Sequence, residues 1–378
     1  MTVSAPLKSP VIRTVDVIIS PRPTTAALSR RRPIVVSFTV FVLLVVAVNL
    51  ALAVALEHGP PHLRDPEYGL RLQSLRERQR EDPHRPLTVI LGSSRTAQGL
   101  RPDVYEQAAT DESPLLFNLS QSGGGPLLQL LTLRRLLADG VRPAAAVVEF
   151  WPPFLRGDAM FREQDRISPS RLRNVDEPTV RQFFVEPEMA WTARHGDSFV
   201  PLIAHRRNLL TRLCPDWLPQ VERTDEVWRH LDGWGWWPGR ITATPEQIAA
   251  GWPTVEGFYG PMYITYHIDP THDRAYRTLL AECQTHGIRV TLVRMPESPR
   301  FRSLQIPQAV EMYEGYLSNL LTEYRVPVID GRDWADPDHL PDGFHLTQAG
   351  ATEFTRRFAS APPRPTTNST PPGTVSRP

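Results

Sequence analysis

Two adjacent serines follow a short apolar run near the start of the chain. Residues 87–91 read LTVIL, Gly92 ends the run, and Ser93 and Ser94 come next. A hydroxyl at the carboxyl end of a strand lies where open α/β sheets bind ligands, and nearby N–H groups can stabilise an oxyanion there. A serine nucleophile is therefore one interpretation of this stretch, and an ordinary helix cap is the other.

A carboxylate and an imidazole stand together near the other end of the chain. Asp342 and His345 are three residues apart, just before a predicted helix. At this spacing they can meet within one turn, where the carboxylate orients the histidine and supports the charge that forms when it takes a proton. A solvated loop is the alternative, but the pair and the serine together predict nucleophilic acyl chemistry.

A glycine-rich stretch, FNLSQSGGGPLL at 117–128, precedes a predicted helix. Consecutive N–H groups in such a stretch can point at an anion. A phosphate-binding loop is the competing interpretation, but the lysine that a P-loop requires is absent. We therefore favour a role in holding a negatively charged oxygen.

Alternating strands and helices must position these residues. Composition predicts buried strands at 87–91, 143–153, 288–296 and 326–330, and leucine periodicity with glycine stops predicts helices at 125–140, 272–287 and 307–324. Short connections between strand and helix are typical of a parallel sheet. The predicted fold class is therefore α/β with a parallel sheet.

An uncharged apolar stretch, residues 34–56, precedes this domain. Its length suits a transmembrane helix, and a buried core helix is the alternative. Arg30, Arg31 and Arg32 stand before it, so the positive-inside rule places residues 1–33 in the cytoplasm as a disordered arm and the rest outside. An uncleaved signal anchor in the cell membrane is the predicted arrangement, with the lipid bilayer as a partner.

The remaining boundaries follow from composition. We expect a linker or stalk over 57–85 with a short polar helix at 69–82, one domain over 86–358 with a large insertion at about 152–260, and a disordered tail over 359–378. The insertion is expected to pack on the sheet, and its aromatic rings suit either sugar faces or a core. It holds seven of the nine tryptophans: Trp191, Trp217, Trp228, Trp234, Trp236, Trp237 and Trp252.

Charge and cysteine content exclude several function classes. The chain has 42 basic and 41 acidic residues, a formal net charge of +1, which gives no reason to expect a nucleic-acid partner. Its two cysteines, Cys214 and Cys283, form no metal-ligand pattern and no disulfide framework, although one disulfide is an open alternative. We expect no metal and no cofactor.

The order of these motifs resembles the SGNH, or GDSL-like, hydrolase superfamily. Residues 92–94, GSS, stand where its first block has Gly-Asp-Ser, and NLSQSG at 118–123 stands for its Asn-x-Gly-x-x-Gly. The sequence DGFH at 342–345 matches its last block, Asp-x-x-His. The resemblance covers about residues 87–150 and 264–358 and implies a three-layer, flavodoxin-like domain.

The resemblance also implies roles for individual residues. Ser94, rather than Ser93, takes the place of the nucleophile, with Asp342 and His345 as its partners. The N–H groups of Ser94 and Gly123 are then the donors to the oxyanion. Around them we expect substrate contacts from the following residues: Arg95, Asn118, Gly124 and Trp151.

One family block is missing. The Gly-x-Asn-Asp expected after the second predicted strand is replaced by VVEFWPPF, which contains Glu149. The asparagine is a third oxyanion donor in the family, and losing one donor typically costs ~10²–10³ in turnover. Either a group from the insertion replaces it or the site is slower. Glu149 is open to two interpretations, a catalytic role or a buried partner of Arg95.

Within the superfamily, LGSSR at 91–95 looks most like the membrane-anchored group that contains D-alanyl transfer proteins and alginate-type O-acetylation proteins. The resemblance implies an extracytoplasmic serine esterase or O-acyltransferase that acts on acyl groups of a cell-envelope polysaccharide. It implies an acylated glycan or acyl donor and a multipass membrane acyltransferase as partners. The alternative is an inactive binding or assembly module of an envelope-polysaccharide complex.

Overall fold

The computed structural model describes residues 25–110, 112–157, 162–225, 227–239, 242 and 244–361, without the side chains of residues 25–32, 197–199 and 221. By internal contacts the chain divides into two units, residues 1–50 and 51–378, which are described separately.

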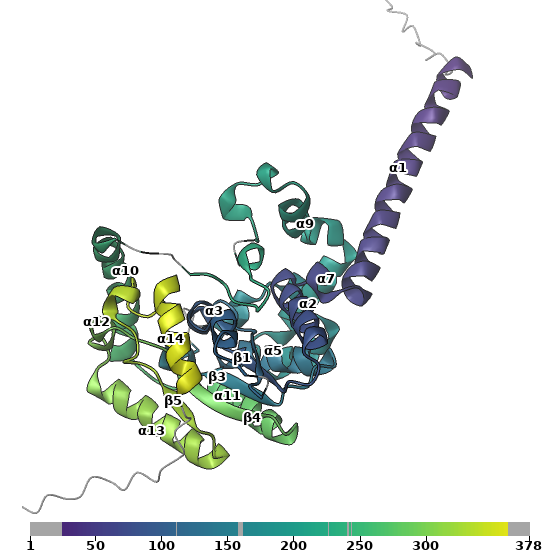
Figure 1. The fold of residues 1–378 in the computed structure, drawn as a ribbon. Helices are drawn as coiled ribbons and strands as arrows, with labels where there is room; N and C mark the ends of the chain where they lie inside the picture. Colours follow the sequence, from purple (N-terminus) through teal and green to yellow (C-terminus); the bar gives the residue numbers. More distant parts are fainter. Residues whose placement is uncertain are drawn as a thin grey trace, which may run out of the picture. The chain divides into compact units, whose positions relative to one another are not determined.

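The first unit contains most of helix α1 (Thr25–His58), which is drawn in purple in Figure 1. The segment Pro33–His58 is long and apolar enough to cross a membrane. The last residues of the predicted N-terminal arm are helical within α1, and residues 1–24 lie outside the described part of the chain. Of the predicted tail, residues 362–378 lie outside it too.

The second unit is built on a parallel sheet, which confirms the predicted α/β class. Its strands run in the order β2-β1-β3-β4-β5, and each neighbouring pair is parallel. The strands are β1 (Leu87–Leu91), β2 (Leu115–Asn118), β3 (Ala145–Glu149), β4 (Arg289–Arg294) and β5 (Val328–Asp330). Parallel pairing brings their carboxyl ends to one edge of the sheet, where a site is expected.

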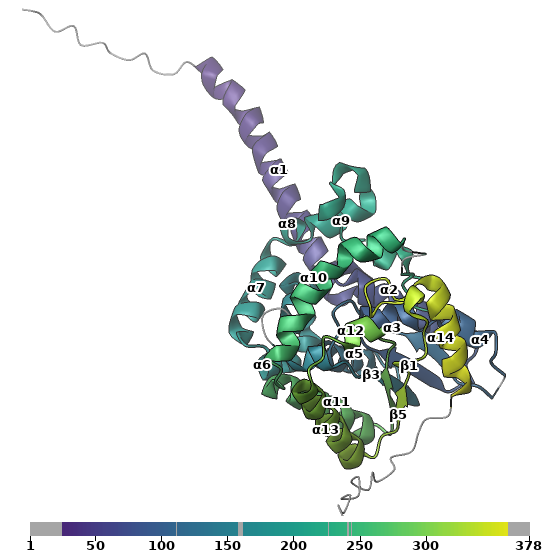
Figure 2. The same cartoon turned by 90° about the vertical axis from the view of Figure 1, so that its left-hand side faces the viewer.

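Helices cover both faces of this sheet, as Figure 2 shows. The side chains of β1 alternate between the faces: Val89 and Leu91 pack with one helical layer, and Ile90 packs with the other. The first layer contains α2 (Pro66–Glu81), α5 (Pro126–Ala138), α11 (Pro270–Thr285) and α13 (Pro307–Tyr324). The second contains α3 (Ser94–Gly99), α4 (Pro102–Glu106) and α14 (Gln348–Ser360).

Residues 57–85, expected to be a linker or stalk, include helix α2. Its side chains Tyr68, Leu72 and Leu75 are buried in the main core beside the sheet. The sequence of α2 is mostly polar, but these three apolar residues share one helical face at spacings of three and four. The helix is therefore part of the domain.

A long crossover, residues 150–288, joins β3 to its neighbour β4 and contains the segment predicted as an insertion. Of its tryptophans, Trp191, Trp236 and Trp252 are buried, whereas Trp217 is 76% exposed. The crossover helices before α11 are α6 (Glu177–Phe183), α7 (Pro187–Phe199), α8 (Pro201–Ala204), α9 (Arg206–Leu213) and α10 (Pro245–Ile264), and α12 (Pro299–Arg302) follows β4. Cys214 and Cys283 are both free thiols.

Short 3₁₀ helices fill the connections. They are Pro61–Leu63, Pro152–Leu155, Glu163–Arg166, Pro169–Arg171, Asn174–Asp176, Pro215–Trp217, Gln220–Glu222, Trp228–His230 and Pro337–His339.

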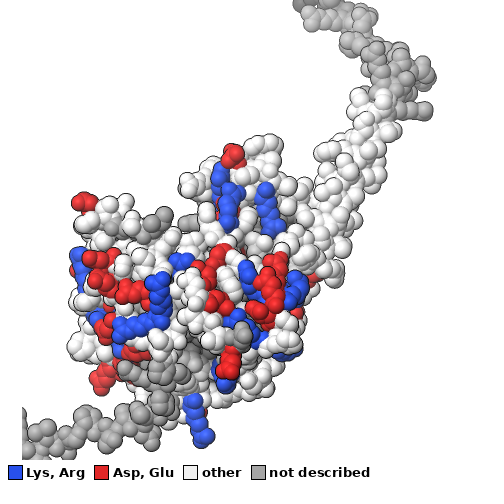
Figure 3. Space-filling view, in the orientation of Figure 1, with Lys and Arg blue, Asp and Glu red and all other residues white. Residues whose placement is uncertain are grey.

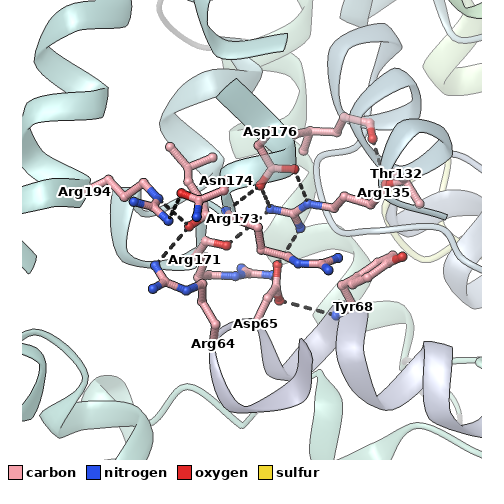
Figure 4. A network of polar contacts seen from close by, with 12 residues as sticks. Arg64, Asp65, Tyr68, Thr132, Arg135, Arg171, Arg173, Asn174, Asp176 and Arg194 are labelled. Atoms are coloured by element: carbon pink, nitrogen blue, oxygen red, sulfur yellow. Dashed lines mark hydrogen bonds and ion pairs between the residues drawn. The ribbon is translucent and has the colours of Figure 1, made fainter. Parts of the chain in front are cut away.

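A buried ionic network fastens the crossover to the start of α2 (Figure 4). Arg135, on α5, donates to the Asp176 carboxylate at 2.6 and 2.8 Å and to Asp65 at 2.9 Å. Asp65 caps α2 by accepting from Tyr68 N, and it also accepts from Arg171 at 2.7 Å. Arg135, Asp65 and Asp176 are each only 1% exposed, so losing one partner would leave an uncompensated buried charge.

Asp65 should make the free energy of unfolding depend on pH in the acid range. Burial raises the pKa of this carboxyl, but Arg171 and Arg135 outweigh burial and lower the pKa to about 2 from an ordinary 3.8. A lowered folded-state pKa stabilises the fold above the unfolded pKa, and the effect is lost as pH falls from about 4 to 2. We expect a contribution of about 2 kcal/mol at neutral pH.

The measurement is the free energy of unfolding of the full chain in neutral detergent between pH 7 and pH 2. Wild type should lose more stability over the acid range than Asp65→Asn, which should already be less stable at pH 7. Asp82→Asn, an exposed change at the other end of α2, is the matched control. Parallel pH curves for wild type and Asp65→Asn would contradict the prediction.

Candidate active site

The turn after β1 places the two serines differently. Ser93 is the N-cap of α3, and its Oγ accepts a hydrogen bond from Arg95 N at 3.1 Å. Ser94 is the first residue of α3 and is partly exposed, whereas Ser93 is fully buried. A side chain at Gly92 would collide with Thr96 and Glu149, so the turn requires a glycine there.

Ser94 lies in a continuous chain of polar contacts with the two residues near the C-terminus. Its Oγ is 2.8 Å from His345 Nε2, and His345 Nδ1 is 2.7 Å from Asp342 Oδ2. The structure thus brings together all three residues assigned to catalysis from the sequence, across 251 positions of chain. The order hydroxyl, imidazole, carboxylate is the arrangement that acyl transfer through serine requires.

A tight turn holds the acid–base pair. Asp342 Oδ1 accepts hydrogen bonds from the N–H groups of Phe344 and His345 at 3.2 and 2.8 Å. Gly343 between them has φ +90°, a conformation that side chains other than hydrogen disfavour. Thr347 then caps α14 by accepting from Gly350 N. The aspartate therefore organises both the turn and the imidazole.

The charge of Asp342 is stabilised where it lies. Burial raises the pKa of this carboxyl, but the His345 imidazole and the two N–H donors outweigh burial and bring the pKa below its ordinary value. The carboxylate is therefore ionised at neutral pH. In that state it can keep the proton of His345 on Nδ1 and leave Nε2 free to accept from Ser94.

Two backbone N–H groups, those of Ser94 and Gly123, are suited to bind a negatively charged oxygen. Within the described part of the chain, neither the Ser94 N–H nor the Gly123 N–H donates a hydrogen bond. The Gly123 loop lies against the end of β1, because Gln121 N donates to Gly92 O and a side chain at Gly124 would collide with the same carbonyl. Gly123 itself has φ +72°.

Arg95 and Glu149 form the buried base of the site. Arg95 is 1% exposed and donates to the backbone carbonyls of Met295, Pro296 and Phe344. Glu149 accepts from Ser93 N at 2.7 Å and lies 3.6 Å from the Arg95 guanidinium. The pairing of Glu149 with Arg95 is thus present, and together the two residues join the serine turn to the histidine turn.

The other expected substrate contacts are also buried. Asn118 donates to Thr96 O and Leu100 O and accepts from Ser120 N. Gly124 is packed on β1, and Trp151 donates to Glu297 while its ring stacks on Phe344 at 5.4 Å. The polar groups of Arg95, Asn118 and Trp151 are engaged within the protein, so these residues support the turns that carry Ser94 and His345.

A hollow beside the imidazole contains Gln98 and His230, which sequence reasoning did not single out, and Trp237, one of the tryptophans expected to suit sugar faces or a core. It has a volume of about 430 Å³, and Asp342 and His345 form one wall. Gln98, His230 and Trp237 line the rest, and Trp237 N is bonded to Ala97 O on α3. The signal in the sequence was the segment GWGWWPG at 233–239, whose glycines and proline favour an extended path across a surface.

Arg166 is a second residue that sequence reasoning missed. It comes from the crossover, and a Cβ added to Gly123 would lie only 3.3 Å from its Cδ and Nε. Its guanidinium stem therefore covers the loop that presents the Gly123 N–H. Among the described residues, no cluster of histidine, cysteine, aspartate and glutamate could hold a metal ion.

Neither a family model nor a curated protein matches the chain. A solved structure from Bacteroides fragilis, provisionally described as an acylhydrolase, is similar over 75% of this chain and 94% of its own, with 12% identity and a TM-score of 0.33. A likeness this weak assigns neither a family nor an activity to the chain.

Proposed function

We propose that the chain is a membrane-anchored serine esterase or O-acyltransferase of the SGNH type. The observation that carries the proposal is the hydrogen-bonded series Ser94, His345 and Asp342 at the carboxyl end of β1. The partly exposed serine, the ionised aspartate and two N–H groups without acceptors among the described residues support it. The motif order noted in the sequence supports the SGNH assignment.

The proposed reaction proceeds through an acyl-enzyme. His345 Nε2 takes the Ser94 proton as Oγ attacks the carbonyl carbon of an ester, and Asp342 holds the Nδ1–H of the resulting imidazolium. The N–H groups of Ser94 and Gly123 donate to the carbonyl oxygen as it gains charge. His345 then protonates the leaving alcohol, and water or a second hydroxyl takes the acyl group.

The site has no asparagine as a third donor to this oxygen. Glu149 stands in that part of the sequence and is engaged with Ser93 and Arg95. We propose that the two N–H groups carry the stabilisation and that turnover is correspondingly modest. The proposed substrate is an acylated glycan or acyl donor of the cell envelope, with a multipass membrane acyltransferase as the proposed partner.

A fluorophosphonate probe tests the chemistry directly. The full chain in neutral detergent should be labelled once, and peptide mass spectrometry should place the phosphonate on Ser94, because only an activated serine reacts at a useful rate. Labelling should stop after heat denaturation. A folded protein that resists the probe, or carries it elsewhere, would refute the enzyme and favour the binding-module alternative.

The proposed location outside the cytoplasm rests on Arg30–Arg32 and the apolar segment Pro33–His58. Alkaline phosphatase needs disulfides that form in oxidising compartments. A phosphatase fused after Pro102 should therefore be active, and a reporter that is active only in the cytoplasm, fused at the same point, should be inactive. The reverse pattern would invert the orientation and remove the envelope glycan from consideration.

A further inference from the structure

A second hollow includes Ser122, the residue before Gly123, in its lining. It has a volume of about 620 Å³, within the range of small-molecule sites, and its lining is strongly basic. Its described lining residues include one acid, Glu67, and five arginines: Arg166, Arg171, Arg206, Arg207 and Arg223. Counted over the lining alone, five positive charges and one negative charge give +4, and three further carboxylates pair with Arg171, Arg207 and Arg223 from outside the lining.

The hollow begins at the proposed oxyanion loop. Ser122 lines it and directly precedes Gly123, and the stem of Arg166 lies over Gly123 itself. A group bound there would sit one residue away from the N–H that faces the reacting carbonyl. The hollow is thus placed to hold a part of the substrate next to the ester, and this placement rests on the proposed function.

The arginines of the hollow differ in whether they form ion pairs within the protein. Arg171 is held by Asp65 and Glu67 at the back, in the ionic network of Figure 4. Arg166 and Arg206 are exposed and have no carboxylate within ion-pair distance among the described residues. Their guanidinium groups are available to a ligand without breaking an ion pair.

The remaining two arginines, Arg207 and Arg223, pair with exposed carboxylates, and Arg223 also donates to Leu218 O. Arg207 lies 3.6 Å from Glu222, and Arg223 lies 3.1 Å from Asp216, which is 93% exposed. Exposed pairs of this kind contribute little, so an incoming anion can displace them. Figure 3 shows basic side chains on the lobe that carries α9.

We propose that this arginine hollow binds a phosphate-bearing group of the substrate or acyl donor. Guanidinium groups bind phosphate oxygens through paired, charge-assisted hydrogen bonds, and an arginine-rich lining suits a phosphate dianion better than a single carboxylate. The hydroxyls of Ser122 and Ser168 on the same lining are further donors. The volume exceeds that of a phosphate alone and leaves room for an attached sugar or glycerol.

Two sources of phosphate fit this position. Pro66 and Glu67 line the hollow and follow His58, the end of the apolar helix, by eight and nine residues. Nine residues span at most about 32 Å even when fully extended. A lipid-linked phosphate and a soluble sugar phosphate therefore both fit the position and the basic lining of the hollow. The experiment distinguishes them.

The test is a binding titration on the full chain carrying Ser94→Ala, in neutral detergent, so that no turnover is needed. Glucose 1-phosphate and dihexanoyl phosphatidic acid are the probes, and glucose, glucuronate and dihexanoyl phosphatidylcholine are their matched controls. We expect saturable binding of one or both phosphate probes, at least about tenfold tighter than any control. The probe that binds more tightly identifies the source.

Substitutions then locate the site. Arg166→Ala with Arg206→Ala should weaken binding about tenfold or more, whereas Arg289→Ala should leave it unchanged. Arg289 is an exposed arginine at the start of β4, at the opposite edge of the sheet from the strand ends that carry the site. The three substituted residues are exposed, so their loss should not unfold the chain.

Three outcomes would overturn the inference: no saturable binding of either phosphate probe, equal binding of glucuronate, or binding that the double substitution leaves intact. The result is independent of the catalytic proposal. If phosphate binds but the fluorophosphonate does not label Ser94, the phosphate site is supported and the proposed enzyme activity is refuted. If Ser94 is labelled but phosphate does not bind, the proposed enzyme activity is supported and the phosphate site is refuted.

Discussion

Replacing Ser94 with alanine should lower ester hydrolysis by ~10⁴- to 10⁶-fold, because the acyl-enzyme can no longer form. The Ser94 hydroxyl is partly exposed, so the free energy of unfolding should change little. His345→Ala should give a loss of the same order, since the two residues act as one unit through the 2.8 Å contact. Hydrolysis of p-nitrophenyl acetate by the full chain in neutral detergent measures all three proteins.

Ser93 provides the matched control for this experiment. It is chemically identical and adjacent, but its Oγ caps α3 and it is fully buried. Ser93→Ala should cost about 1 kcal/mol of stability through the lost cap and should reduce activity only in part. An inactive Ser93→Ala beside an active Ser94→Ala would show that the nucleophile is the other serine. Full activity in both would exclude serine catalysis at this turn.

The two ends of the candidate site could be predicted because each is local in sequence. A glycine and two serines after an apolar run indicate a strand end, and Asp342 and His345 fit within one turn whatever the rest of the chain does. Their meeting across 251 positions depends on the parallel sheet, which the alternation of strands and helices also predicted. Strand β1 and helices α5, α11 and α13 fall where composition and periodicity place them.

Shorter or more polar elements were predicted less completely: strand β2 was missed, and helix α2 was expected only as a polar helix or stalk. Strand β2 has only four residues, and its end merges with the glycine-rich segment that was read as a loop. Helix α2 is mostly polar, so its three buried side chains did not stand out as part of a core. In both, packing against neighbours that are distant in sequence decides the outcome, and no local pattern reveals it.

The buried roles of polar residues could be predicted only in part. Arg95 was expected either to contact substrate or to pair with a buried Glu149, and the structure shows the pairing, together with a carbonyl acceptor 200 positions away. Asn118 uses its side-chain amide and oxygen on the backbone between α3 and the Gly123 loop. A charged or amide side chain beside a predicted nucleophile can face solvent or brace the turn, and only tertiary partners distinguish the two.

Replacing Asp342 with asparagine should lower kcat by ~10⁴-fold while the fold survives. The asparagine oxygen can still accept from the N–H groups of Phe344 and His345, so the turn is kept. What changes is the 2.7 Å contact to Nδ1, because an amide NH₂ there favours the histidine tautomer whose Nε2 carries the proton. That tautomer cannot accept the Ser94 proton, and the imidazolium also loses its countercharge.

The pH dependence of stability separates this catalytic effect from damage to the fold. The folded-state pKa of Asp342 is lowered, so its charge contributes stability above its ordinary pKa of 3.8 and loses it only as pH falls below that value. Wild type and Asp342→Asn should therefore differ most in stability near neutral pH and converge in acid. Their kcat values should differ wherever the wild-type enzyme is active.

Asp338→Asn, an exposed change four residues earlier, is the control and should leave both quantities unchanged. An Asp342→Asn variant that hydrolyses p-nitrophenyl acetate within tenfold of wild type would show that the aspartate does not orient the base.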